Sequence, residues 1–344
     1  MKLILTILDG LSEAGIKELN YMTPLEYAYT PIIDRIKDEG RHEKRIFYPT
    51  GRQPDSLSCI LSILGVDKDK IPNNRAYLEA VASGIDIEEN EAVFRCNLIS
   101  ADKNTMDSFN GKGLSNRKMD EVSENLKTAD GIKFYHLRDY RNILVLEKNK
   151  ELLSLKTVPP HENVGMRIDE LFKEFKTVKI LNDFIVDNQI FINGRRYLFY
   201  PWGLSEKVNL PSFFSIHKKT CSMVCGAEIV KGMAKLMNID LPVLRNATGD
   251  ADTDLKEKAE TVLKEIRTHD VVVAHINGTD ELSHRKDIQG KVDFIEKIDR
   301  EFLSEIYSNA DDTKLIVLSD HRTSCVTGRH EKGFVDYIIN RREE

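Results

Sequence analysis

The chain has 344 residues, of which 41% are apolar and 31% are charged, and its formal net charge is −6. This composition is typical of a globular protein with about two domains, and the acidic balance without a basic stripe argues against a nucleic-acid partner. No stretch approaches the roughly 18 apolar residues of a membrane span, and the start, MKLILTILDG, lacks the long apolar run of a signal peptide. Five scattered cysteines fit a reducing compartment. We therefore expect a cytoplasmic protein without a membrane partner, and the sequence leaves its oligomeric state open.

Strand-like runs near both ends of the chain predict one parallel sheet. LILTIL (3–8) is typical of a strand buried on both faces, and TPLEYAYTPIIDRIKDEG (23–40) has helical periodicity. Two more strand-like runs are DVVVAHINGTD (270–280) and TKLIVLSDH (313–321), with an amphipathic helix predicted over 291–307. The order strand, helix, strand indicates a parallel α/β sheet.

The middle of the chain differs from its ends. From about residue 76 to 205 it is richer in charge, with short apolar stretches such as AVFRCNLIS and RRYLFYPWG. We expect an α+β domain at 76–205 that is inserted into a discontinuous α/β domain of residues 1–75 and 206–344.

Chemically active side chains follow the predicted strands. Ligands of open α/β sheets bind beyond the carboxyl ends of the strands. Three carboxylates and three imidazoles stand there or shortly after: Asp9, Asp280, His284, Asp320, His321 and His330. Such a nitrogen and oxygen set suits Zn²⁺, Mn²⁺, Fe or Co, and six ligands are too many for one catalytic metal with an open position. Singly, each residue is also compatible with a turn, a helix cap or the surface; together they predict a site for two metals.

The stretch GRQPDSLSCILSILG (51–65) contains three serines, Ser56, Ser58 and Ser62. A serine hydroxyl becomes a good nucleophile only when a base or a metal activates it. The stretch alone is therefore compatible both with a polar cap on a buried helix and with a nucleophile.

Many motifs of the chain resemble those of one family. They are ILDG (7–10), TPLEYAYTPIIDRIKDEG (23–40), LSILG (61–65), RAYLEAVASGIDI (75–87), FRCNLIS (94–100), DSFNGKG (107–113), PPH (159–161), EIVKGMAKLMNI (228–239), NATGDADTD (246–254), GTDELSH (278–284) and SDHRTSC (319–325). In these motifs the chain resembles the alkaline-phosphatase superfamily and, within it, the archaeal-type cofactor-independent phosphoglycerate mutases. The resemblance implies an alkaline-phosphatase-like three-layer α/β domain with a parallel sheet and an inserted α+β lid domain.

The resemblance also assigns a role to each site residue. Carried over by motif, Asp9, Ser56, Asp320 and His321 are the ligands of one metal, and Asp280, His284 and His330 are those of the other. Ser56 matches the serine that becomes phosphorylated. The implied cofactors are two divalent ions, Mn²⁺ in the first place, with Zn²⁺, Co²⁺ or Mg²⁺ as alternatives.

The implied reaction is the interconversion of 3-phosphoglycerate and 2-phosphoglycerate through a phosphoserine. The partner is then a small phosphorylated metabolite, held under the lid by Arg75, Arg95, Lys112, Arg141 and His161. The alternative is a related dinuclear-metal phosphohydrolase or phosphotransferase that acts on another small phosphorylated metabolite.

Several positions near the expected site depart from the family pattern. Asp55 and Leu57 flank Ser56 in place of Gly and Asp, Arg322-Thr323-Ser324 replaces Ser-Thr-Pro, and Asn277 stands where a lysine is common. These changes spare every expected metal ligand but alter the surroundings of the substrate, so the alternative reaction stays open.

Overall fold

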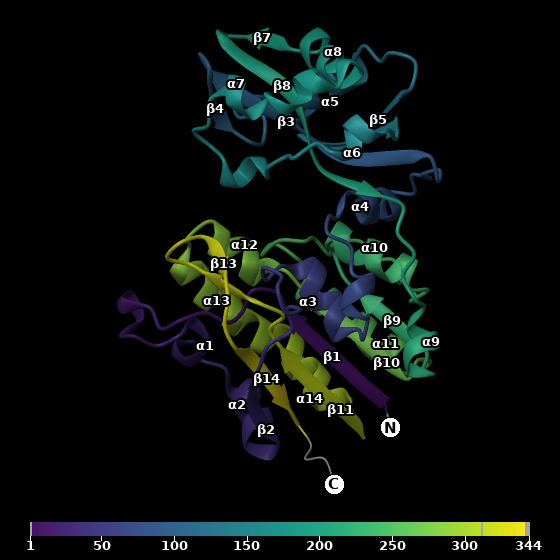
Figure 1. The fold of residues 1–344 in the computed structure, drawn as a ribbon. Coiled ribbons are helices and arrows are strands. Elements are labelled where there is room, and N and C mark those ends of the chain that lie inside the picture. Colours follow the sequence, from purple (N-terminus) through teal and green to yellow (C-terminus); the bar gives the residue numbers. More distant parts are fainter. Residues whose placement is uncertain (1, 311, 341–344) are drawn as a thin grey trace. The chain divides into compact units, whose positions relative to one another are not determined.

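The structure, a computed structural model, describes residues 2–310 and 312–340 (Figure 1). The chain divides into two compact units: unit 1 comprises Met1–Pro72 and Asn209–Glu344, and unit 2 comprises Asn73–Val208. The sequence places these boundaries at 75/76 and 205/206. Among the described residues, no helix is long and apolar enough to cross a membrane.

Unit 1 is built around a six-stranded sheet. Its strand order is β2 (Arg41–Arg45), β14 (Val335–Ile339), β11 (Thr313–Leu318), β1 (Lys2–Leu8), β10 (Val271–Ile276) and β9 (Cys221–Val224). The four strands from β11 to β9 are parallel, whereas β14 and β2 add an antiparallel edge. Because β1 is central and parallel to both neighbours, its carboxyl end lies beside the carboxyl ends of β10 and β11.

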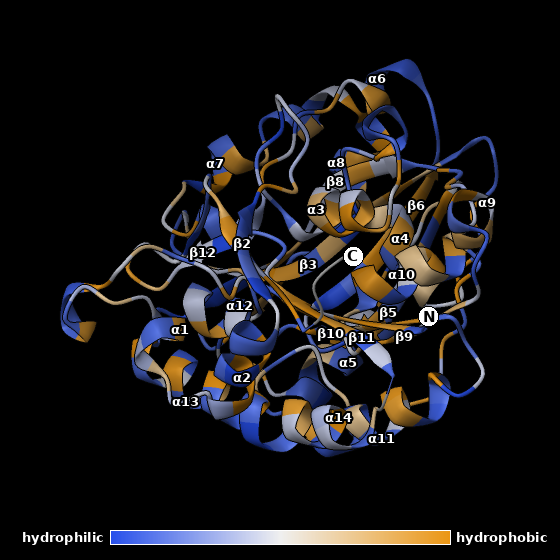
Figure 2. Cartoon of the chain, turned by 90° about the horizontal axis from the view of Figure 1, so that it is seen from below, coloured by the Kyte–Doolittle hydropathy of each residue, from blue (hydrophilic) through white to orange (hydrophobic). Residues whose placement is uncertain are grey.

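Helices cover both faces of this sheet (Figure 2). One face packs against α2 (Pro31–Glu39), α11 (Leu255–Glu265), α13 (Ile288–Ile298) and α14 (Ser304–Asn309), which share a buried core with Ile4 and Leu8 of β1. The other face lies toward α3 (Ser56–Ile63) and α10 (Glu228–Leu236). The intervening residues Leu5 and Ile7 are also buried, as the apolar run predicts for a strand covered on both sides. The predicted three-layer α/β class is confirmed.

The helical stretch predicted at 23–40 is two helices rather than one. The short α1 (Pro24–Tyr27) ends at Ala28, whose backbone is extended, and α2 begins at Pro31. A proline disfavours helical conformation in the residue that precedes it but fits the first position of a new helix. The start of α2 is also held by the buried Asp299, whose carboxylate accepts hydrogen bonds from the backbone N–H groups of Ile32 and Ile33 at 3.1 and 2.8 Å.

Unit 2 is an antiparallel sheet with helices packed on it. The main path is β5 (Ile132–Arg138), β6 (Arg141–Glu147), β3 (Glu91–Asp102), β8 (Arg195–Glu206) and β7 (Ile190–Ile192), and β4 (Thr105–Ser108) pairs with β3. Its core is separate from that of unit 1 and contains the aromatic side chains Phe94, Phe175, Phe199, Tyr200 and Trp202, together with residues of α5 (Asn116–Glu124), α7 (Ile168–Leu171) and α8 (Lys179–Asp187).

Because the two units have separate cores, we expect a core substitution to destabilise the unit that contains it and to leave the other unit largely unaffected. Trp202 is the only tryptophan of the sequence and is buried in unit 2, so tryptophan fluorescence reports on that unit. Phe199→Ala removes a fully buried ring and should lower the free energy of unfolding seen by fluorescence in urea by about 3–5 kcal/mol.

The matched control is Phe302→Ala, which removes an equally buried ring from unit 1. It should shift the far-ultraviolet circular dichroism transition and leave the fluorescence transition largely in place. Equal shifts of the fluorescence midpoint in both variants would contradict independent unfolding of the two cores.

Candidate metal centre

Asp9 stands at the end of β1 and is almost completely buried. Its Oδ2 accepts a hydrogen bond from Nε2 of His275 at 2.8 Å, and its Oδ1 lies 3.2 Å from Nε2 of His321. Burial and the nearby Asp280 would raise the pKa of Asp9, but the hydrogen bonds with His275 and His321 hold it down, at about 2. Asp9 is therefore an anion in the folded protein.

Asp320 and His321 follow β11 and lie beside Asp9. Oδ1 of Asp320 accepts a hydrogen bond from the backbone N–H of Gly10 at 3.1 Å, whereas its buried Oδ2 has no hydrogen-bond partner among the described residues. Burial and the charge of Asp9 raise the pKa of Asp320 to about 8. Burial alone would lower the pKa of His321, but Asp320 and Asp9 raise it to about 10.

Asp280 and His284 lie one helical turn apart on α12 (Gly278–His284), as their spacing predicts. Nε2 of His284 lies 3.2 Å from Oδ2 of Asp280, and Nε2 of His330 lies 3.5 Å from Oδ1 of the same carboxylate. The two imidazoles are 3.2 Å apart between their Nε2 atoms. Burial opposes ionisation of Asp280, but His284 and His330 bring its pKa well below the ordinary value. Burial would lower the pKa of His284, but the hydrogen bond and the charge of Asp280 raise it to about 9.

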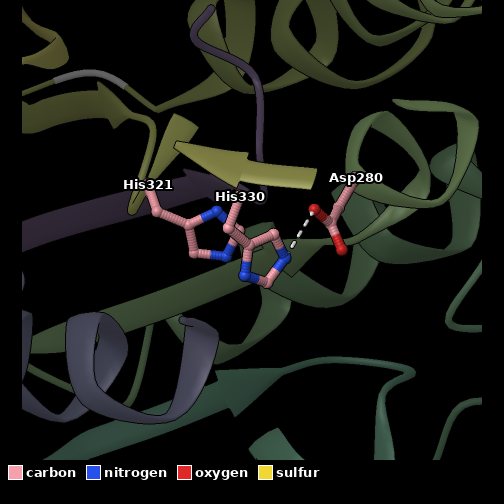
Figure 3. Close-up of side chains that lie close together, drawn as sticks. All are labelled: Asp280, His321 and His330. Atoms are coloured by element: carbon pink, nitrogen blue, oxygen red, sulfur yellow. Dashed lines mark ion pairs between the residues drawn. The ribbon is translucent and has the colours of Figure 1, made fainter. Parts of the chain in front are cut away.

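His330 reaches this group from a small hairpin. It lies on β13 (Arg329–Glu331), which pairs with β12 (Arg322–Ser324) so that Thr323 faces His330. Figure 3 shows Asp280, His321 and His330 with their polar atoms turned toward one another. The chain thus brings residues from three strand ends and one hairpin into a single cluster.

Ser56 begins α3 and points into the same cluster. Its Oγ lies 3.3 Å from Oδ1 of Asp9 and 3.1 Å from Nε2 of His321. The unusual neighbour Asp55 is the N-cap of α3, where its Oδ1 accepts a hydrogen bond from the backbone N–H of Ser58 at 2.7 Å. Asp55 therefore stabilises the helix end that presents Ser56.

Two sets of three residues have ligand atoms close enough for one metal each. They are Asp9 with Asp320 and His321, and Asp280 with His321 and His330. His321 belongs to both sets, and His284 belongs to neither, although it contacts Asp280 and His330. The division of the ligands between two metals that the family resemblance implies stays a prediction.

The chemistry of the cluster fits divalent cations. Three buried carboxylates lie together, and burial together with the charge of Asp9 raises the pKa of Asp320, which keeps it protonated near neutral pH when no cation is bound. Oδ2 of Asp320 accepts no hydrogen bond from the described residues, and Nε2 of His321 lies 3.4 Å from it. Carboxylate oxygens and imidazole nitrogens are the ligands that Zn²⁺ and Mn²⁺ prefer.

In unit 2, two predicted substrate-binding arginines share one carboxylate. Nε of Arg95 lies 2.7 Å from Oε2 of Glu79, and Nε of Arg75 lies 3.3 Å from its Oε1. The guanidinium of Arg95 also stacks on the ring of Trp202 at 4.1 Å, and its buried Nη1 has no hydrogen-bond partner in the described part of the chain. Burial and Arg75 lower the pKa of Arg95 to about 10, so an added anion would be stabilised here.

The other three predicted substrate residues differ in their surroundings. His161 packs against Trp202 and Phe109, with ring centroids 5.8 and 6.2 Å apart. The guanidinium of Arg141 lies 5.0 Å from the ring centroid of Tyr140. The side chain of Lys112 is exposed, while its backbone carbonyl accepts hydrogen bonds from the side chains of Arg195 and Tyr197.

Sequence reasoning missed four residues that contact the predicted ones: His275, Thr323, Glu79 and Trp202. A histidine inside the apolar run of β10, the single tryptophan of the chain and the threonine of the SDHRTSC motif were visible signals, whereas Glu79 carried none.

The fold and the site together define a metal-dependent enzyme of the alkaline-phosphatase type. The model of the metalloenzyme superfamily matches residues 1–342, and the chain belongs to this superfamily. The kinship expected from the motifs, with the archaeal-type mutases of the alkaline-phosphatase superfamily, is confirmed.

Two similar proteins are archaeal enzymes that carry the same name. The 2,3-bisphosphoglycerate-independent phosphoglycerate mutase of Methanopyrus kandleri is 26% identical, over 96% of this chain and 85% of the relative. The enzyme of the same name from Methanosarcina mazei is 25% identical, over 100% of this chain and 91% of the relative.

Two solved structures share the fold. A protein of Pyrococcus horikoshii aligns with a TM-score of 0.74 at 22% identity, covering 98% of this chain and 87% of that one. The cofactor-independent phosphoglycerate mutase of Thermoplasma acidophilum aligns with a TM-score of 0.59 at 19% identity, covering 99% of this chain and 90% of that one.

Metal affinity should rise with pH. Without metal, Asp320, His284 and His321 have pKa values of about 8, 9 and 10 and hold protons at neutral pH, and a cation must displace these protons when it binds. We expect Mn²⁺ to bind more tightly as the pH rises from about 6.5 to 8.5, with release of protons. Titration calorimetry in buffers of different ionisation enthalpy measures both quantities. Binding that is independent of pH and releases no proton would contradict these ionisation states.

Proposed function

We propose that this protein is a metal-dependent phosphomutase that interconverts 3-phosphoglycerate and 2-phosphoglycerate through a phosphoserine at Ser56. The observation that carries the proposal is the position of Ser56 Oγ, 3.3 Å from Oδ1 of Asp9 and 3.1 Å from Nε2 of His321. Similarity over nearly the full length to proteins named as such mutases supports it. A small phosphorylated metabolite as partner and a cytoplasmic location are part of the same proposal.

We assign the ligands as the family motifs imply. Asp9, Ser56, Asp320 and His321 hold one metal, and Asp280, His284 and His330 hold the other. When bound, two divalent cations, Mn²⁺ first and Zn²⁺, Co²⁺ or Mg²⁺ as alternatives, lower the pKa of the serine hydroxyl and neutralise charge on the phosphate.

The reaction then proceeds through two transfers at one serine. Ser56 Oγ attacks phosphorus, the bond between phosphorus and the substrate oxygen breaks, and that oxygen leaves with a proton as the hydroxyl of glycerate. The phosphate remains on Ser56 at the N-terminus of α3, where the positive end of the helix dipole favours its negative charge. The other hydroxyl of glycerate attacks the phosphoserine, which restores Ser56 and completes the isomerisation.

We assign substrate binding and the role of a lid to residues 76–205 together with Arg75. Arg75 and Arg95 share the single negative charge of Glu79, so this pair has an excess positive charge that suits a carboxylate or a phosphate. Lys112, Arg141 and His161 are the further candidates. A lid that excludes water matters because water attacking the phosphoserine would convert a mutase into a phosphatase.

One observation favours the alternative, a phosphohydrolase or phosphotransferase for another small metabolite. Asn277 stands where the family often has a lysine, and its Nδ2 donates hydrogen bonds to the backbone carbonyl of Gly249 at 2.8 Å and to Glu281 at 3.4 Å. This position therefore supplies no cation beside Asp280, and the substrate must be neutralised elsewhere.

A metal-supplemented screen of phosphorylated metabolites distinguishes these reactions. With Mn²⁺ and 3-phosphoglycerate we expect 2-phosphoglycerate as the main product and little free phosphate, because the glycerate is retained until it takes the phosphate back. Isomers are measured by nuclear magnetic resonance and phosphate by a colorimetric assay. Free phosphate as the main product would indicate a hydrolase, and turnover of a different ester alone would replace phosphoglycerate as the substrate.

Ser56→Ala should lower turnover by about 10³-fold or more, because the nucleophile is lost, while Mn²⁺ still binds to the remaining carboxylates and imidazoles. The matched control is Ser62→Ala on the same helix, where the hydroxyl only bonds back to the carbonyl of Ser58 at 2.8 Å. Ser62→Ala should retain activity. Wild-type turnover in Ser56→Ala, or a phosphopeptide mapped to another serine, would refute the assignment.

A further inference from the structure

The hydroxyl of Thr323 lies between the two halves of the cluster. Thr323 is fully buried, and its Oγ1 lies 2.6 Å from Oδ1 of Asp280 and 3.1 Å from Nδ1 of His321. An ionised carboxylate only accepts hydrogen bonds, so the hydroxyl donates to Asp280 and its oxygen accepts from the N–H of His321. This arrangement places the proton of the imidazole on Nδ1.

The hydrogen bond with Thr323 determines which nitrogen of His321 is available to a metal. Nε2 faces Asp9 at 3.2 Å and Ser56 at 3.1 Å. Because the hydrogen bond with Thr323 retains the proton on Nδ1, Nε2 is the nitrogen that would bind a cation in place of its own proton. Partners that hold the distal nitrogen of a ligating histidine set both its tautomer and its ring orientation. Thr323 therefore contacts a predicted ligand of each metal site, His321 in one and Asp280 in the other.

We propose that Thr323 is a positioning residue that joins the two metal sites by orienting one ligand of each. This inference rests on the proposed metal centre and assigns to it a residue that binds neither metal itself. Its two hydrogen bonds run in sequence, from His321 to Thr323 and from Thr323 to Asp280, so one hydroxyl contacts a predicted ligand of each metal site.

Gly10 leaves the space that this bridge needs. A Cβ atom at residue 10 would lie 2.6 Å from Oγ1 of Thr323 and 2.7 Å from Oδ1 of Asp280, which are the two atoms of one hydrogen bond. The backbone of Gly10 also has a φ of +61°, a conformation that favours glycine. Any other residue at position 10 would collide with the bridge.

A buried ion pair holds the backbone of Thr323 in place. Nζ of Lys291 donates to the carbonyl of Thr323 at 3.1 Å, to that of Gly10 at 2.9 Å and to Oε1 of Glu13 at 2.7 Å. Oε2 of Glu13 accepts from the backbone N–H of Cys325 at 2.9 Å, and the N–H of Thr323 donates to the carbonyl of Ser12 at 3.1 Å. The backbone on both sides of the hydroxyl is thus anchored by the protein alone, without a metal.

The test compares Thr323→Val with Thr323→Ser in the full chain. Valine keeps the shape but loses both hydrogen bonds, whereas serine keeps the hydroxyl. Metal binding is followed by titration calorimetry with Mn²⁺ and by the visible absorption of bound Co²⁺, which reports ligand geometry. We expect Thr323→Val to lose about 10- to 100-fold in metal affinity and to change the Co²⁺ spectrum, and Thr323→Ser to bind as the wild type does.

Thr30→Val is the matched control. Thr30 is also buried in unit 1, and its Oγ1 has no hydrogen-bond partner within the described ranges. This variant undergoes the same substitution and should keep wild-type affinity and the wild-type Co²⁺ spectrum.

The possible outcomes distinguish a failure of the metal centre from a failure of the positioning role of Thr323. If the wild type binds no metal, the metal centre itself is refuted. If the wild type binds metal and Thr323→Val binds it equally well with an unchanged spectrum, or if Thr323→Ser is as weak as Thr323→Val, the positioning role is overturned while the metal centre stands. Far-ultraviolet circular dichroism of each variant shows whether weaker binding reflects unfolding.

Discussion

The burial of three carboxylates side by side is the constraint on which the rest of unit 1 depends. Asp9, Asp280 and Asp320 lie buried together, and burial together with the charges of Asp9 and Asp280 raises the pKa of Asp320 to about 8. Like charges in such a place all ionise only when cations or donors compensate them. The fold must therefore hold the three groups against their repulsion until metals bind.

The compensating donors form a closed ring. The backbone N–H of Gly10, next to Asp9, donates to Asp320. The hydroxyl of Thr323, three residues after Asp320, donates to Asp280. Nε2 of His275, on the strand that leads to Asp280, donates to Asp9. Each segment that carries one carboxylate thus supplies the hydrogen bond that orients the next one. Displacing any one of the three strand ends disturbs two carboxylates, which ties the geometry of the metal centre to the register of β1, β10 and β11.

The sequence predicts the carboxylates well and their donors poorly, for a physical reason. Asp9, Asp280 and Asp320 follow apolar runs, and strand ends of a parallel sheet meet at one edge whatever the details of packing. The donors depend on register: His275 lies near Asp9 because it pairs with Ile7 of β1, and no local pattern encodes that pairing. The antiparallel edge formed by β14 and β2 escaped prediction likewise, since short strands of mixed polarity carry little periodic signal.

The expected metal ligands of this chain match the family motifs, whereas several residues near Ser56 depart from them. A side chain in the carboxylate ring touches two partners that are themselves held, so substitution there disturbs more than one carboxylate of the cluster. Residues around the substrate lack this mutual constraint: Asp55 becomes a helix cap, and Asn277 bonds to a neighbouring carbonyl, without displacing any expected ligand. Phosphoryl transfer is thereby fixed by the packing of the strand ends, whereas the choice of phosphate ester is free to follow the less constrained positions around Ser56.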